Sequence, residues 1–429
     1  MPDILQQLSS SRREGKPTGI YSVCSAHPWV IEAAIDQAIE DESSLLIEAT
    51  CNQVNHQGGY TGMLPSDFIH LVQHIASRRG LPMDKLIFGG DHLGPNPWRS
   101  RSSGEAMREA CTMVKAYVEA GFHKVHLDAS MACADDTAPL SNEVIARRAA
   151  ELCAVAEQHS GAHKPVYVIG TEVPVPGGAT ESLAELAVTT REAAEETLHI
   201  HRRVFRDHGL EDAWTRVIAL VVQPGVEFNH DSVVDYDPRL TVSLTGLLDH
   251  ENIVFEAHST DYQRPESYQN LVQDGFAILK VGPALTFAMR EALFALESIE
   301  AELFSSQEHS NLQAVLEQTM MDDPVHWAGH YHGDASSQHL LRKYSYSDRV
   351  RYYWGYPRVQ QAVARLVSNL DAVSIPETML SAWLPNQYRC IRNGRLQPNA
   401  TAIILHRIRE ALAPYAAACA PHQRGALQI

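Results

Sequence analysis

The chain has 429 residues, of which 45% are hydrophobic and 20% are charged, a balance typical of a globular protein with a large buried core. Its formal net charge is −17, which argues against nucleic acid as a partner because an acidic surface repels phosphate backbones. The seven cysteines include no CxxC pair, which argues against a disulfide framework and against a cysteine zinc site.

Short apolar segments alternate with longer amphipathic segments from the start of the chain to about residue 303. We expect eight strands, at residues 21–25, 45–49, 86–90, 124–128, 166–170, 216–222, 253–257 and 277–281. The first helix is expected to open at Pro28, because apolar residues then recur at the spacing of one helical face. We expect the later helices at residues 66–79, 105–120, 144–158, 192–206, 240–249, 266–273 and 287–303.

Eight strand-then-helix units in one series imply parallel strands with right-handed crossovers, and eight such units close a (β/α)8 barrel, the TIM-barrel fold. A doubly wound open sheet is the alternative, but it requires no particular strand count. The Gly-rich loop that would favour it after the first strand is absent, since that position reads SAHPW. We therefore predict a barrel over residues 1–304 that carries the site. A helical extension over residues 305–429 would cover the barrel or make subunit contacts.

Polar residues follow nearly every predicted strand, at the barrel end where active sites form. They include Glu48, Asn52, Asp91, His92, His126, Asp128, Glu172, Gln223, Glu256, His258, Ser259, Asp261, Lys280 and Gly282. Any one of them could be an ordinary solvated loop residue. Together they indicate a pocket around a metal or a polar ligand, because buried charges need partners.

The chemistry of these residue types suggests metal binding and proton transfer. His92 and His258 suit a divalent metal such as Zn²⁺ or Mn²⁺, because imidazole nitrogens are common ligands of catalytic metals. The candidate general acids and bases are Asp91, Glu172 and Asp261.

A phosphate site is expected after the eighth strand, where Gly282 precedes a helix and backbone N–H groups can approach an anion. Ser259 and Lys280 could assist it, with Asn52 as a further substrate ligand. Lys280 could instead pair with a barrel carboxylate such as Glu256. His126 and Asp128 alternate on one strand and therefore share a face, so they either join the site or brace it.

Eight motifs resemble one known family. They are GIYSVCSAHP, LIEATCNQVNHQGGYTGM, GGDHLGPN, HLDAS, YVIGTEVPVPGG, VVQPGVEF, FEAHSTDYQ and ILKVGPALTFA. They are similar to the signatures of the GatZ/KbaZ family, the Z-type subunits of D-tagatose-1,6-bisphosphate aldolase. The resemblance runs from about residue 15 to near the C-terminus. The segments SLAELAVTT and HYHGD look more like the N-acetylgalactosamine-type branch than the galactitol-type branch.

The resemblance implies a barrel partner of a metal-dependent Y-type subunit that cleaves tagatose 1,6-bisphosphate, with the Z-type chain supporting activity and stability. Members have also been called tagatose-6-phosphate kinases, but the sequence contains no P-loop. Other relatives are described as 4-epimerases of tagatose 6-phosphate.

Class II aldolases carry an Asp-His pair after strand three, a Glu after strand five and a metal His after strand seven. These features match Asp91-His92, Glu172 and His258. Class II aldolases also carry a metal His after strand six, where this sequence reads QPGVEF. That departure leaves Gln223 or Glu172 to complete the metal sphere, or implies that the metal is lost.

Two functions remain open. We expect first a supporting component of tagatose-bisphosphate aldolase in galactitol or N-acetylgalactosamine catabolism, because the strand-six histidine is missing. The alternative is an autonomous metal-dependent tagatose 6-phosphate 4-epimerase of retro-aldol type, favoured by the other site residues. The expected partners are a Y-type subunit and a sugar phosphate, with a homo-oligomer left open, and neither nucleic acid nor a membrane. The N-terminus lacks a signal-peptide core and no apolar run is long enough to span a membrane, so we expect a cytoplasmic protein.

Overall fold

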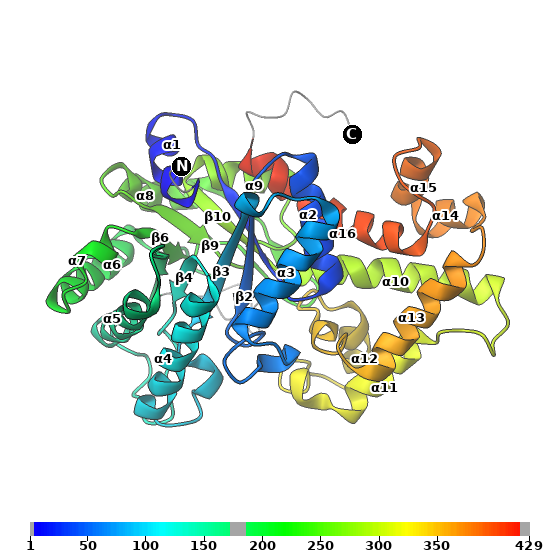
Figure 1. Ribbon diagram of the computed structural model, residues 1–429, viewed down its shortest axis with the longest axis horizontal. Coiled ribbons are helices and arrows are strands. Elements are labelled where there is room, and N and C mark those ends of the chain that lie inside the picture. The colour runs from blue at the N-terminus through cyan, green and yellow to red at the C-terminus, as the bar shows by residue number, and fades with distance from the viewer. Residues whose placement is uncertain (1–3, 172–185, 421–429) are drawn as a thin grey trace.

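Eight parallel strands form a closed barrel in the computed structural model, which describes residues 4–171 and 186–420 (Figure 1). They are β1 (Ile20–Cys24), β2 (Leu45–Thr50), β3 (Leu86–Leu93), β4 (Lys124–Leu127), β5 (Val166–Ile169), β6 (Val217–Val222), β9 (Val254–Ala257) and β10 (Phe276–Val281). Each strand pairs with its neighbour in this order, and β1 closes the ring on β10 with Ser22 opposite Lys280. The predicted (β/α)8 class is confirmed, and each predicted strand overlaps an observed one.

Helices follow the strands around the outside of the barrel. They are α2 (Pro28–Glu40), α3 (Pro65–Arg79), α4 (Ser103–Ala120), α5 (Asn142–His159), α6 (Arg191–Asp207), α8 (Pro238–Thr245), α9 (Pro265–Gln273) and α10 (Pro283–Leu303). Local signals define their ends: α4 begins with a capping box of Ser102 and Glu105 and ends at Gly121, whose φ of 105° suits glycine. The helix α10 begins at Pro283 rather than at residue 287, because proline fits the first helical position.

The amino-terminal end of the barrel is filled by apolar side chains. The helix α1 (Ile4–Arg13) was not expected from the sequence, and its Leu5 and Leu8 are buried in a cluster with Leu46, Val168 and Ile218 of the barrel strands. A two-stranded hairpin of β7 (Glu227–Phe228) and β8 (Val233–Val234) follows β6 and was also missed. With that end filled, the polar interior of the barrel lies toward the carboxyl ends of the strands.

Residues after α10 form helices gathered on one side of the barrel, at the right of Figure 1. They are α11 (Leu312–Asp322), α12 (Ala335–Tyr344), α13 (Pro357–Asp371), α14 (Glu377–Trp383), α15 (Pro385–Arg392) and α16 (Ala400–Cys419). The last of them returns to the barrel, where the Tyr415 hydroxyl donates to the carbonyl oxygen of Thr260 at 2.8 Å. These helices share one hydrophobic core with the barrel. Residue 304 therefore marks where the alternation of strands and helices ends, and not a boundary between two separate cores.

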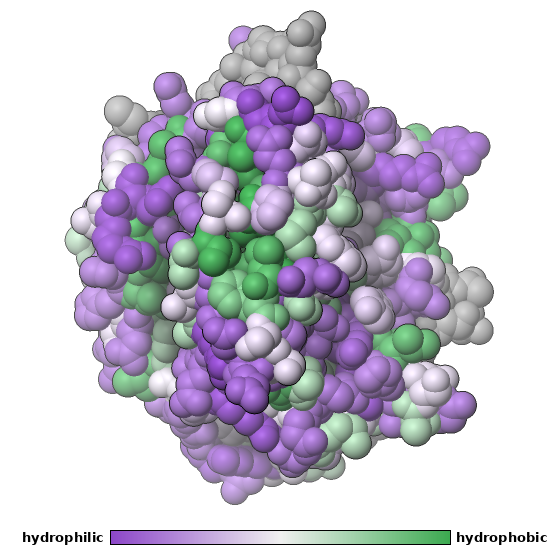
Figure 2. All heavy atoms as spheres, turned by 90° about the vertical axis from the view of Figure 1, so that its right-hand side faces the viewer, coloured by the Kyte–Doolittle hydropathy of each residue, from purple (hydrophilic) through white to green (hydrophobic). Residues whose placement is uncertain are grey.

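The face formed by these C-terminal helices is mostly hydrophilic with a hydrophobic area in its middle (Figure 2). On the same extension, Leu340, Tyr344 and Trp383 are at least half exposed. No helix within residues 4–171 and 186–420 is long and apolar enough to cross a membrane.

Candidate metal centre

Four charged side chains form the floor of a polar site inside the barrel. Lys124 Nζ on β4 lies 2.6 Å from Glu48 Oε1 on β2 and 2.7 Å from Glu256 Oε2 on β9. Lys280 of β10 pairs with Glu48 and lies 3.8 Å from Glu256. All four side chains are buried, and Lys124 meets its partners as ion pairs rather than as well-directed hydrogen bonds. The two positive charges offset the desolvation of the two carboxylates.

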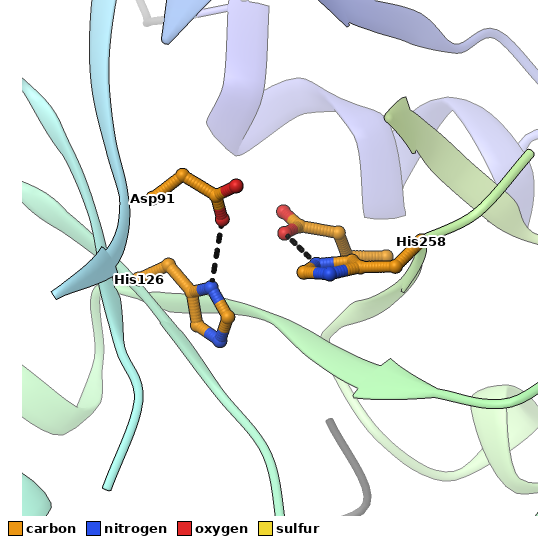
Figure 3. Close-up of side chains that lie close together, drawn as sticks. Asp91, His126 and His258 are labelled. Carbon is orange, nitrogen blue, oxygen red and sulfur yellow. Dashed lines mark hydrogen bonds and ion pairs between the residues drawn. The ribbon is translucent and has the colours of Figure 1, made fainter. Parts of the chain in front are cut away.

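Three imidazoles converge above this floor. His92 lies near the end of β3, His126 lies on β4 and His258 follows β9, and their ring centroids are 4.9 to 5.3 Å apart. The Nδ1 atom of His126 lies 2.9 Å from Asp91 Oδ1, and the Nε2 atom of His258 lies 2.9 Å from Glu256 Oε1. Figure 3 shows Asp91 and His126 on neighbouring strands, with His258 facing them across the site.

The donor set fits a divalent cation. Asp91, His126, Glu256 and His258 each offer one ligand atom, and these atoms all lie within 4.8 Å of one another. Burial lowers the pKa of His258 to about 4, so its imidazole is neutral and has a lone pair for a metal. Histidine and carboxylate together are typical ligands of catalytic zinc and related ions.

The charge of the cluster fits as well. Four buried carboxylates, those of Glu48, Asp91, Asp128 and Glu256, face two ammonium groups, those of Lys124 and Lys280. The carboxylates outnumber the ammonium groups by two, and a proton on His92, whose pKa is raised by Asp91 and Asp128 against the effect of burial, offsets only part of this excess. Such an excess is costly unless a cation or protons compensate it.

A second group of possible ligands, Cys24, Glu48 and Asp91, lies beside the first. Burial raises the pKa of the Cys24 thiol far above its usual value, so it stays protonated, and the thiolate is the form that binds metals. Asp91 belongs to both groups, and Glu48 and Glu256 each contact both lysines, so the groups differ in the thiol of the one and the two imidazoles of the other. We therefore take the histidine-containing group as the candidate metal centre.

Asp128 orients His92 next to this group. The Nδ1 atom of His92 lies 2.7 Å from Asp128 Oδ2, and the Ser130 hydroxyl donates to Asp128 Oδ1 at 2.6 Å. Burial alone would lower the pKa of His92, but the charge of Asp91 and the contact with Asp128 raise it. His92 also has a φ of 52°, a strained value for histidine that is often kept for function.

Residues 5–420 match the model of a family described as D-tagatose-1,6-bisphosphate aldolase subunit GatZ/KbaZ-like. The chain belongs to this family. It is also similar in structure to a protein from Sinorhizobium meliloti 1021 described as a probable tagatose 6 phosphate kinase. That match has 49% sequence identity and a TM-score of 0.87, and it covers 94% of this chain and 100% of the other.

Two further structures are similar at 14% identity. The YdjI aldolase from Escherichia coli K12 has a TM-score of 0.41 with 84% of this chain and 96% of the other covered. The fructose-bisphosphate aldolase (Fba) from Campylobacter jejuni has a TM-score of 0.43 with 87% and 95% covered. Similarity at this level says nothing about the site of the GatZ/KbaZ-like chain.

Most of the predicted site residues of this GatZ/KbaZ-like chain line one cavity of about 90 Å³. They are Asn52, Asp91, His92, His258, Ser259, Asp261, Lys280 and Gly282. Gln223 is not among them: its Oε1 atom accepts hydrogen bonds from the backbone N–H groups of Gly225 and Val226, which holds the loop after β6. Glu172 lies outside the described residues.

The backbone amides expected to bind phosphate already have a partner. Asp261 Oδ1 accepts hydrogen bonds from the N–H groups of Gly282, at 3.0 Å, and Ala284, at 2.9 Å, where α10 begins. A carboxylate of the chain itself therefore binds this helix N-terminus. Burial raises the pKa of Asp261 to about 6.

Sequence analysis counted Glu48, His126 and Glu256 among the polar residues at the strand ends but gave them no settled role in the GatZ/KbaZ-like site, and it passed over Lys124. A signal for them existed, because each is a charged or imidazole residue inside an otherwise apolar strand, and Lys124 shares the strand face of His126. Arg351 and Tyr352 also line the cavity but come from the C-terminal extension. No local pattern connects them with the strand ends.

Proposed function

We propose that this chain is a divalent-metal-dependent enzyme that acts on a tagatose phosphate by retro-aldol chemistry, with 4-epimerisation of tagatose 6-phosphate as the reaction to test first. The observation that carries the proposal is the convergence of His92, His126 and His258 over a buried cluster in which carboxylates outnumber ammonium groups. The sequence lacks the strand-six histidine, which favoured a purely supporting role. His126 of β4 provides a third imidazole from another strand.

Asp91, His126, Glu256 and His258 would hold the cation. A divalent ion there would polarise the carbonyl group of a bound ketose. The chain's own residues do the rest: Lys280 Nζ, 2.8 Å from Asp91 Oδ1, helps to keep Asp91 ionised. Asp128 fixes the ring of His92 through Nδ1, which leaves Nε2 to accept or donate a proton.

Asp261 remains a candidate general acid or base. A carboxyl group with a pKa of about 6 exchanges protons readily near neutral pH. It also lines the cavity beside His258 and Gly282. Glu172 keeps the same proposed role from its position after β5.

A supporting role for a Y-type aldolase subunit is the second candidate function. The match to a family described as an aldolase subunit favours it. The exposed Leu340, Tyr344 and Trp383 of the extension offer apolar contact area for such a partner. The N-acetylgalactosamine-type branch and the place in galactitol or galactosamine catabolism belong to this proposal.

The test uses the full-length chain purified alone. Metal content is measured after loading with Zn²⁺ or Mn²⁺, and turnover is measured with tagatose 6-phosphate and the 1,6-bisphosphate. We expect His126→Ala and His258→Ala to weaken metal binding by more than about 100-fold, since even residues that only support ligands change affinity 10- to 100-fold. His201→Ala is the matched control, because His201 is equally buried but lies on α6, outside the barrel.

Metal-dependent turnover that both site variants lose and the control keeps would support the enzyme. A chain without turnover that raises the activity of a Y-type subunit would support the second function. If it neither binds metal nor assists a Y-type subunit, both proposals are wrong. Phosphate transfer from ATP would point instead to kinase chemistry, for which the sequence contains no P-loop.

A further inference from the structure

A larger cavity, of about 590 Å³, adjoins the cavity of about 90 Å³ that Asp91 and His258 of the candidate metal centre line. The two cavities share the lining residues Cys24, Gln53, Tyr60, Gly282, Pro283, Arg351 and Tyr352. The volume lies within the range of about 300–1,000 Å³ that is usual for small-molecule sites. A substrate whose carbonyl lies at the metal centre would therefore extend into this space.

The charged side chain in the lining of the larger cavity is positive, although the chain carries a net charge of −17. Among the described residues that line it there is one guanidinium, that of Arg351, and no carboxylate. The other basic side chain is His27, and burial lowers its pKa to about 4, so it is neutral. An isolated positive charge in a cavity without acidic groups favours an anionic ligand.

Arg351 is held in place without being neutralised. Its Nη1 atom donates to the carbonyl oxygens of Ser347 and Asp348, and its Nη2 atom donates to the Tyr352 hydroxyl at 3.0 Å. A guanidinium has five N–H donors, so two of them remain for a ligand. No carboxylate in the described parts of the chain lies within ion-pair distance of Arg351, and the Asp348 carboxylate is bound by Thr286 and Arg290.

The helix N-terminus after the last barrel strand, which often binds phosphate in such barrels, is occupied by a side chain of the protein itself. The N–H groups of Gly282 and Ala284, where α10 begins, donate to the Asp261 carboxylate. A substrate phosphate in this cavity would therefore need a cationic partner other than that helix N-terminus. Arg351 lies on the wall that joins the two cavities and meets this requirement.

We propose that Arg351 binds the phosphate monoester of the substrate, with the Tyr352 hydroxyl as a second donor, so that the C-terminal extension supplies phosphate recognition to the barrel site. The proposal rests on the proposed action on a phosphorylated ketose. The Tyr352 hydroxyl accepts its hydrogen bond from Arg351 and can give its own proton to a phosphate oxygen. The Arg351 guanidinium also lies 4.6 Å from the centre of the Tyr352 ring, which adds a cation–π contact to the pair.

The test measures binding and needs no turnover. Calorimetric titrations of the metal-loaded full chain compare tagatose 6-phosphate, tagatose and inorganic phosphate for the wild type and for Arg351→Met. We expect Arg351→Met to weaken the binding of tagatose 6-phosphate by about 10- to 100-fold, because charge-assisted hydrogen bonds are lost. The affinity for tagatose and the metal content should stay unchanged. Arg358→Met is the control, since Arg358 is exposed and pairs with Asp322 at 2.6 Å, away from the cavity.

Equal affinities of wild type and Arg351→Met for the sugar phosphate would overturn the proposal, and so would an equal loss for unphosphorylated tagatose. If the wild type binds inorganic phosphate through Arg351 but no ketose phosphate, the anion site stands and the proposed function fails. If no phosphate compound binds, the anion site is refuted. Tyr352→Phe, which removes only a hydroxyl group, serves if Arg351→Met does not fold. Tyr352→Phe should weaken the binding of tagatose 6-phosphate about 3- to 10-fold, and unchanged binding would then count against the proposed phosphate site.

Discussion

The substitution Lys124→Met removes an ammonium group that lies between two buried carboxylates. The side chains of Lys124, Glu48 and Glu256 are 0% exposed, and the two ion-pair distances are 2.6 and 2.7 Å. Methionine has a similar length and keeps most of the apolar contacts, so the change is mainly one of charge. The two carboxylates would then share only Lys280, which also pairs with Asp91.

Removing one partner of a buried ion pair costs about 3–5 kcal/mol, because a desolvated charge is left without compensation. That is a large part of the roughly 5–15 kcal/mol by which native proteins are stable. The control Lys115→Met removes an exposed lysine whose i,i+4 contact with Glu119 is 3.8 Å long, and such pairs contribute about 0.3–0.5 kcal/mol.

The measurement is the free energy of unfolding in urea at pH 7, followed by circular dichroism, for wild type and both variants. We expect Lys124→Met to lose several times more stability than Lys115→Met. Adding Glu48→Gln to Lys124→Met should recover part of the loss, since one of the two stranded charges is removed. A loss at Lys124 no larger than at Lys115, or no recovery in the double variant, would refute the proposed charge balance of the barrel floor.

Two further expectations concern neighbouring positions. The raised pKa of Asp261, about 6 against an ordinary 3.8, means that its contribution to stability is complete below about pH 4. It is lost as the pH rises through 6, by up to about 3 kcal/mol at about 1.36 kcal/mol per pKa unit. Asp261→Asn keeps an acceptor for the two amides of α10, so unfolding curves between pH 4 and 7.5 should show a flatter dependence than wild type, and parallel curves would contradict this. A methyl group at Gly94 would lie 1.6 Å from the carbonyl oxygen of Asp128, so Gly94→Ala should cost about 1–3 kcal/mol or more and disturb His92. In the control Gly104→Ala, the atom nearest to the added methyl group is 3.7 Å away, so the change should be neutral or stabilising by up to about 1 kcal/mol. Equal melting temperatures for the two variants would contradict the expected steric clash at Gly94.

Periodicity along the sequence was sufficient for the barrel and indicated several residues of the candidate site. Strand and helix positions follow from local spacing of apolar residues, and the eight-fold alternation implies closure. Because parallel strands present their carboxyl ends on one side, Asp91, His92 and His258 were expected together, and they line one cavity. The two-residue repeat of residues 124–128 also predicted that His126 and Asp128 share a face, although β4 ends at Leu127 and Asp128 follows it.

The tertiary structure alone decided which partner each side chain meets. Lys124 and Glu256 are on strands far apart in sequence, and only barrel closure brings them to 2.7 Å. Asp261 accepts hydrogen bonds from the backbone amides that were expected to bind a phosphate. This contact depends on the path of the loop after β9. Arg351 reaches the cavity because the C-terminal helices pack back on the barrel. Local spacing determines the type and face of an element, whereas distances between elements depend on non-local packing, which the order of residues does not show directly.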